Sequence, residues 1–135
     1  MSRRVVITGL GVISPNGNGV PDFLNAIEQG ISGIQFIPEY EELKFNCQVC
    51  GLPDFKLEQL KNYLSETSLY GLKGQAIALG IKVALDAWMD AGNEIITKDT
   101  LWETGCVFGS SVADTAVIKN AITRVDAKES KKLGS

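Results

Sequence analysis

The stretch from Gln75 to Gly92, QAIALGIKVALDAWMDAG, constrains this chain more than any other. Its few charged residues, Lys82, Asp86 and Asp90, recur every four residues and therefore form one narrow stripe on a helix. Nearly all other positions are apolar or small, and the closing glycine is typical of a helix C-terminus. A helix that is apolar over most of its circumference must be covered on more than one side. We therefore predict a core helix of an α/β domain.

The overall composition fits one ordinary globular domain: 135 residues, 44% hydrophobic and 21% charged. A formal net charge of -3, without a basic patch, argues against nucleic-acid binding. No apolar run approaches the about 18 residues of a membrane span. The opening MSRRVVITGLG leads directly into a strand pattern and lacks the layout of a signal peptide. We therefore expect a cytoplasmic protein that binds neither membrane nor nucleic acid.

The sequence contains three cysteines and no histidine. Cys47 and Cys50 form a C-x-x-C, which is compatible with a redox or metal-binding pair, but no second pair completes a zinc site. They lie in a strand-like segment, where residues three apart face opposite sides, and this favours two ordinary thiols. Without histidine, the chain has no Ser-His or Cys-His unit of its own. We therefore expect no metal and no cofactor.

Two short runs have the pattern of buried parallel strands, namely RVVIT at Arg4–Thr8 and CVF at Cys106–Phe108. The loop after the first run begins with Gly-Leu-Gly, as a dinucleotide-binding fingerprint would. However, the position of the third glycine holds Ser14, and Pro15 follows where that fingerprint needs a helix to begin. The loop is therefore not expected to bind a nucleotide.

Apolar residues at helical spacing predict further helices at about 20–29, 55–64 and 113–125. The pattern of FNCQVCGL favours a short edge strand, and ISGIQFIPEYEEL is expected to be irregular packed chain. Residues 65–74 are expected to form a polar connector. Two parallel strands and one edge strand are too little sheet to bury the central helix. We therefore expect further strands from another chain or from a longer protein.

Four motifs occur in the order and spacing of one family: RRVVITGLGVISPNG, EQGISGI, LDAWMDAG and TGCVFGSSV. The chain resembles the N-terminal portion of a β-ketoacyl-[acyl carrier protein] synthase over essentially its whole length, Arg3 to about Ser135. The resemblance implies an α/β, thiolase-like fold of two similar halves, with mostly parallel or mixed sheet and covering helices. Residues 1–135 would then supply part of the first half and be incomplete as a domain.

The resemblance also implies an acyltransferase that performs a decarboxylative Claisen condensation in fatty-acid or polyketide synthesis. In the family, a cysteine takes the acyl group from acyl carrier protein, and two histidines help to decarboxylate the malonyl unit and stabilise the enolate and oxyanion. The implied partners are acyl carrier protein with acyl and malonyl thioesters, and a second, related subunit in a homodimer or heterodimer. The family's nucleophile lies beyond Ser135, and Cys106 does not match it. We therefore expect no catalytic residue in this chain.

By matching motifs, the wall of the family's acyl pocket near the dimer interface falls on Ser111 and Val112. A small residue there leaves room for an acyl chain, and an apolar valine can contact it. The plainer interpretation is that Gly109, Ser110 and Ser111 form a tight strand-to-helix turn, and both interpretations can hold. Ser111 and Val112 are the candidate substrate-binding residues.

The segment before the central helix departs from the family. The family usually has Arg and Asp there, whereas this chain has GLKGQ at residues 71–75. The departure leaves open a specialised polyketide-type synthase, and also a non-catalytic, chain-length-factor-like subunit that pairs with an active ketosynthase. A third hypothesis is an independent binding domain, complete at 135 residues, which would unfold as a cooperative monomer.

Overall fold

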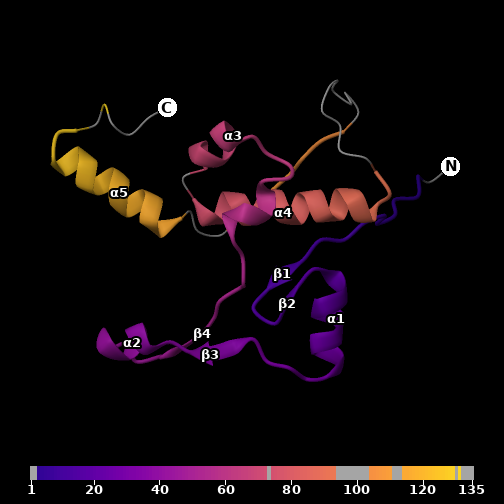
Figure 1. Cartoon of the computed structure of the whole chain (residues 1–135), viewed down its shortest axis with the longest axis horizontal. Coiled ribbons are helices and arrows are strands. Elements are labelled where there is room, and N and C mark those ends of the chain that lie inside the picture. Colours follow the sequence, from indigo (N-terminus) through magenta and orange to yellow (C-terminus); the bar gives the residue numbers. More distant parts are fainter. Residues whose placement is uncertain (1–2, 73, 94–103, 111–113, 130, 132–135) are drawn as a thin grey trace.

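Helix α4, Gln75–Asp90, lies at the centre of the molecule and confirms the predicted helix (Figure 1). Its predicted place in a core is not formed within the described residues, because Ala78 is its one buried residue. The computed structural model describes residues 3–72, 74–93, 104–110, 114–129 and 131. Gly92 follows the helix at φ 78°, and its N–H donates to the carbonyl oxygen of Met89 over 2.9 Å. The left-handed conformation at this glycine ends the helix as the sequence predicts.

The charged stripe of α4 makes two specific contacts. The Lys82 ammonium donates to the carboxylate of Asp86, with a shortest N–O distance of 2.5 Å. At the end of the helix, Asp90 accepts the backbone N–H of Leu10 over 2.8 Å. The stripe therefore does more than face solvent, because its last carboxylate holds the N-terminal loop.

The N-terminal loop turns through a small hairpin into the first helix. Strands β1 (Ile13–Ser14) and β2 (Gly17–Asn18) pair antiparallel, and α1 (Val20–Glu28) follows directly. Pro21 lies in the first turn of α1, where its missing N–H costs no hydrogen bond, and Gly30 follows the helix at φ 66°. The predicted helix at 20–29 is thus confirmed.

The segment expected to be irregular instead forms a small arm. Strand β3 (Ile34–Phe36) leads into helix α2 (Pro38–Glu42), and strand β4 (Val49–Gly51) returns antiparallel to β3. The predicted short strand in FNCQVCGL is confirmed as β4. The prediction of irregular chain was wrong. The three residues of β3 are too few to show a strand periodicity, and they are stabilised by pairing with β4, which is distant in sequence.

Two other local predictions need correction. Only the 3₁₀ helix η1 (Leu57–Leu60) and turns occupy the segment expected to be an α-helix at 55–64. Helix α3 (Glu66–Gly71) occupies the expected polar connector, and the Ser65 hydroxyl caps it by accepting the N–H of Ser68 over 3.1 Å. Helix α5 (Thr115–Asp126) confirms the last predicted helix.

The two predicted parallel strands are not formed within the described residues. Residues 4–8 and 106–108 are extended but pair with no strand in the described chain, whose two sheets, β1–β2 and β3–β4, are each two-stranded and antiparallel. Both segments lie against α4 and line, with it, a cavity of about 600 Å³. Val5 and Val107 are 94% and 97% exposed. The mostly parallel or mixed sheet of the predicted fold class is therefore not formed within the described residues, because a buried parallel strand needs neighbouring strands.

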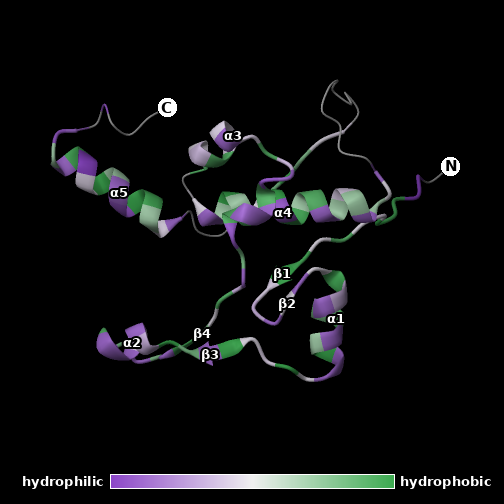
Figure 2. Ribbon diagram, viewed as in Figure 1, coloured by the Kyte–Doolittle hydropathy of each residue, from purple (hydrophilic) through white to green (hydrophobic). Residues whose placement is uncertain are grey.

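Much apolar surface stays uncovered. Among the described residues the buried hydrophobic side chains are Ala26, Ile37, Leu60 and Ala78, while α4 remains largely half-buried and apolar along its length (Figure 2). The total accessible surface is 11350 Å². A folded monomer of 14.6 kDa is expected to expose about 6900 Å². The helices and strands therefore bury only a small hydrophobic core between them.

Candidate functional site

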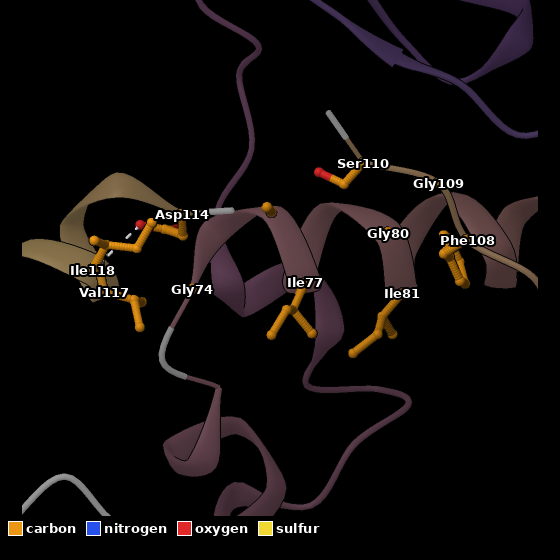
Figure 3. Close-up of a pocket in the computed structure, with 11 residues that line it drawn as sticks. Gly74, Ile77, Gly80, Ile81, Phe108, Gly109, Ser110, Asp114, Val117 and Ile118 are labelled. Atoms are coloured by element: carbon orange, nitrogen blue, oxygen red, sulfur yellow. Dashed lines mark hydrogen bonds between the residues drawn. The ribbon is translucent and has the colours of Figure 1, made fainter. Parts of the chain in front are cut away.

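An apolar groove of about 590 Å³ opens beside the N-terminal half of α4. Three parts of the chain line it: the start of α4, the extended segment 104–110 and the first turn of α5 (Figure 3). The lining residues are Gly74, Ala76, Ile77, Gly80, Ile81, Phe108, Gly109, Ser110, Asp114, Val117 and Ile118. The volume is in the range of pockets that hold a small organic ligand, and its lining suits an apolar one.

Branched side chains from both helices and one aromatic ring shape the groove. Ile77 and Ile81 are one helical turn apart on α4 and point in the same direction (Figure 3). Phe108 lies against the helix at Gly80, where an added Cβ would come within 3.3 Å of the aromatic ring. Gly80 therefore lets the ring approach the α4 backbone, and the ring forms a wall of the groove.

Asp114 is the ionisable residue among the described residues that line the groove. Its Oδ1 accepts the N–H groups of Ala116 and Val117 over 3.0 and 3.3 Å, so it is the N-cap of α5. Its Oδ2 accepts the N–H of Gln75, the first residue of α4, over 2.8 Å. The N–H of Gln75 and then that of Val117 stabilise the charged form, and they hold the pKa of Asp114 below its ordinary value.

The candidate substrate-binding residues, Ser111 and Val112, lie outside the described residues. Their described neighbours on either side, Ser110 and Asp114, both line the groove. The alternative interpretation of residues 109–111 as a plain strand-to-helix turn likewise stays a prediction.

Sequence reasoning missed the bridging role of Asp114 and the groove-lining residues of α5. A signal for the cap was present, because an aspartate directly before an apolar helical run is a typical N-cap. The second bond, to a residue 39 positions earlier, has no sequence signal. Likewise, periodicity predicted the helix that carries Val117, but the groove depends on which other segment this helix meets.

The C-x-x-C lies on the arm, on and beside β4. Cys47 is exposed and Cys50 half-buried, and each thiol lies 3.6 Å from a backbone carbonyl oxygen, that of Val49 and Gly51 respectively. A hydrogen bond between the Cys50 thiol and the Tyr40 hydroxyl is the main cause that raises the pKa of Tyr40. Across the ranges that the structure describes, no three Cys, Asp or Glu residues lie together as metal ligands.

Cys106, the third cysteine, is exposed in the extended segment 104–110 and lines the cavity between that segment and the N-terminal strand-like run. As for membrane insertion, none of the helices in the described part of the chain has both the length and the apolar character to cross a bilayer.

Comparison with known proteins identifies the family. The family model described as "Beta-ketoacyl synthase, N-terminal domain" matches residues 2–134. The chain is 32% identical over 127 residues to 3-oxoacyl-[acyl-carrier-protein] synthase 1 of Haemophilus influenzae, covering 93% of this chain and 29% of that protein. It is 33% identical over 114 residues to 3-oxoacyl-[acyl-carrier-protein] synthase 2 of Coxiella burnetii, covering 82% of this chain and 26% of that protein.

The chain is 26% identical over 127 residues to a protein of Streptomyces halstedii that is named as a polyketide beta-ketoacyl synthase, covering 89% of this chain and 28% of that protein. The chain thus spans less than a third of the length of these relatives. The matching domain implies the thiolase-like fold that the sequence motifs suggested. From a match of this family model over nearly all of its residues, we conclude that this chain belongs to the β-ketoacyl synthase family.

Proposed function

We propose that this chain supplies the N-terminal segment of a β-ketoacyl-[acyl carrier protein] synthase that performs a decarboxylative Claisen condensation. Its substrates would be the acyl and malonyl thioesters of acyl carrier protein, in fatty-acid or polyketide synthesis. The names of the related proteins support this reaction class. The segment itself would contribute scaffold, dimer contacts and a wall of the acyl pocket.

The observation that carries this proposal is the apolar groove between α4, residues 104–110 and α5. An acyl chain is an unbranched apolar ligand, and Ile77, Ile81 and Phe108 offer it apolar contact. Because Ser110 and Asp114 both line this groove, Ser111 and Val112 between them are suited to the proposed pocket wall.

The condensation in this family uses two histidines, and this sequence contains none. A thioester exchange requires a nucleophile, and the malonyl decarboxylation requires donors that stabilise an enolate and an oxyanion. With no histidine in 135 residues, those donors would come from the rest of the enzyme. The large uncovered surface of α4 and its neighbours supports a segment that is incomplete as a domain.

The first experiment is the denatured intact mass of every polypeptide that purifies with this chain. The expected result is a longer species or a second polypeptide that contains a cysteine and two histidines. Acyl transfer from acyl carrier protein to that cysteine, detected as a mass increase, then tests the reaction. A 14.6 kDa species that is folded, monomeric and does not bind a hydrophobic dye would contradict the proposal and favour an independent binding domain.

A second candidate function is a chain-length-factor-like subunit that pairs with an active ketosynthase. The GLKGQ segment, which departs from the family before the central helix, favours it. The two candidates differ in where the acyl group is found. A synthase carries it on a cysteine of the polypeptide that continues this sequence, whereas a chain-length-factor-like subunit lacks that cysteine and only its partner becomes acylated.

Replacing Val112 with tryptophan is expected to shorten the longest acyl chain that the complete enzyme accepts. The added bulk would fill the proposed pocket, and each methylene excluded from apolar contact should lower affinity about fourfold. The measurement is the rate of acyl transfer over a series of chain lengths. Val125→Trp is the matched control, because Val125 is 55% exposed on α5 and does not line the groove. An unchanged chain-length series for Val112→Trp would remove Val112 from the pocket wall.

A further inference from the structure

One carboxylate joins the N-terminal ends of two helices in this structure. Asp114 caps its own helix, α5, through Oδ1, and its Oδ2 accepts the N–H of Gln75 at the start of α4 over 2.8 Å. An ordinary N-cap satisfies N–H groups of the helix that follows it in sequence. Asp114 does this and also serves a helix that begins 39 residues earlier.

Helix α4 has no side-chain cap of its own, so Asp114 takes the place of one. Its N-cap position is Gly74, which has no side chain to accept the first N–H groups of the helix. A Cβ built on Gly74 would come within 3.2 Å of the Asp114 Oδ2. The absent side chain at Gly74 thus leaves the space that the carboxylate uses, and the two residues complement each other.

The bridge lies at the point where both walls of the groove begin. From Gln75 the chain continues to Ile77 on α4, and from Asp114 it continues to Val117 on α5. Figure 1 shows α5 projecting from the N-terminal end of α4 rather than lying along it, and direct packing between the two helices is sparse. Packing therefore does little to fix the distance between the two walls, whereas the hydrogen bond to Gln75 does.

We infer that Asp114 is a positioning residue that sets the width of the groove, and through it the length of acyl chain that is accepted. This inference rests on the proposed function of the groove as an acyl-binding wall. Asp114 itself need not touch the acyl chain, because it acts through the placement of Val117 and Ile118 against α4.

Asparagine at this position separates the bridge from the cap. An asparagine has one acceptor oxygen, and its other terminal group is an NH₂ that only donates. Since asparagine and aspartate are about equally good N-caps, Asp114→Asn can keep the bonds to Ala116 and Val117 but then cannot accept the N–H of Gln75. Asp114→Ala loses both functions. Ser65→Ala is the matched control, because it removes the cap of α3 and does not touch the groove.

The test measures the binding of saturated fatty acids of graded length to the assembled protein, by displacement of a fluorescent fatty acid. Wild type and Ser65→Ala are expected to show the same preferred length. Asp114→Asn and Asp114→Ala are expected to flatten the profile, with about a fourfold loss at the preferred length for each methylene that loses contact. If Asp114→Asn keeps the wild-type profile, the positioning role is wrong, and a change in Asp114→Ala alone would point to the cap instead.

Amide hydrogen exchange tests the bridge without relying on ligand binding. In Asp114→Asn, the N–H of Gln75 is expected to exchange about tenfold faster, while that of Val117 keeps its protection. Unchanged exchange at Gln75 would contradict the bridge itself. Wild-type protein that binds no fatty acid, together with faster exchange at Gln75 in the variant, would instead contradict the proposed acyl wall and the specificity role that depends on it.

Discussion

Gly11→Ala and Gly9→Ala are each expected to lower the free energy of unfolding by about 3 kcal/mol, because an added methyl group would overlap the backbone of α4. A Cβ on Gly11 would overlap the carbonyl oxygen of Val83, and one on Gly9 would overlap that of Ala87. No change of rotamer relieves an overlap with main-chain atoms. The loop would have to move away from the helix as a whole.

That movement would also break the bond between them. Leu10, which lies between the two glycines, donates its N–H to Asp90 over 2.8 Å. The close approach of the loop to α4 and the hydrogen bond from Leu10 to Asp90 therefore depend on each other. The two glycines allow the loop to lie against α4, and the Asp90 carboxylate at the end of α4 holds it there. The Gly-Leu-Gly that resembles the start of a nucleotide fingerprint thus has a packing role.

Thermal unfolding of the assembled protein measures the effect, and Gly71→Ala is the matched control. Gly71 ends α3, and an added Cβ there would meet nothing within 4 Å. Alanine is the better helix former, so this variant should be neutral or slightly stabilising. If Gly11→Ala and Gly9→Ala unfold at the same temperature as Gly71→Ala, the close approach of this loop to α4 is wrong.

Leu60→Ala is expected to lower the free energy of unfolding by about 3 kcal/mol as well, for the opposite reason. Leu60 lies in η1, which packs against α4, and its side chain is 0% exposed, the largest fully buried side chain in the described chain. Truncation removes its apolar contacts and leaves a cavity between η1 and α4. Its backbone carbonyl still accepts the N–H of Leu64 over 2.9 Å, so the turn itself is kept.

The matched control lies in the same 3₁₀ helix. Leu57 is 42% exposed, so Leu57→Ala loses less buried area and should cost about 1 kcal/mol. Chemical unfolding of both variants separates the two cases, because a change in midpoint at constant slope reports stability alone. Equal midpoints for Leu57→Ala and Leu60→Ala would show that Leu60 is not buried against α4 in the assembled protein.

At the candidate site, local sequence patterns predict some features and not others. The order of residues identified the family and directed attention to the segment around Ser111 and Val112, whose described neighbours line the groove. Composition and periodicity could not show that Phe108 would rest on Gly80, or that Asp114 would accept the N–H of Gln75. Those contacts join residues about 30 to 40 positions apart, and no local pattern encodes them.

By itself, the sequence determined what depends on neighbouring residues. The 3.6-residue period defined α1, α4 and α5, and the glycine after α4 ended that helix, because helical hydrogen bonds and end caps form within one or two turns. Only the tertiary structure decided which extended segments pair. It paired β3 with β4 and left residues 4–8 and 106–108 lying against α4, with no strand partner among the described residues. A strand is stabilised by hydrogen bonds to a second segment. Its own residues therefore specify only a preference for the strand conformation, and the presence of a partner segment decides whether a strand forms.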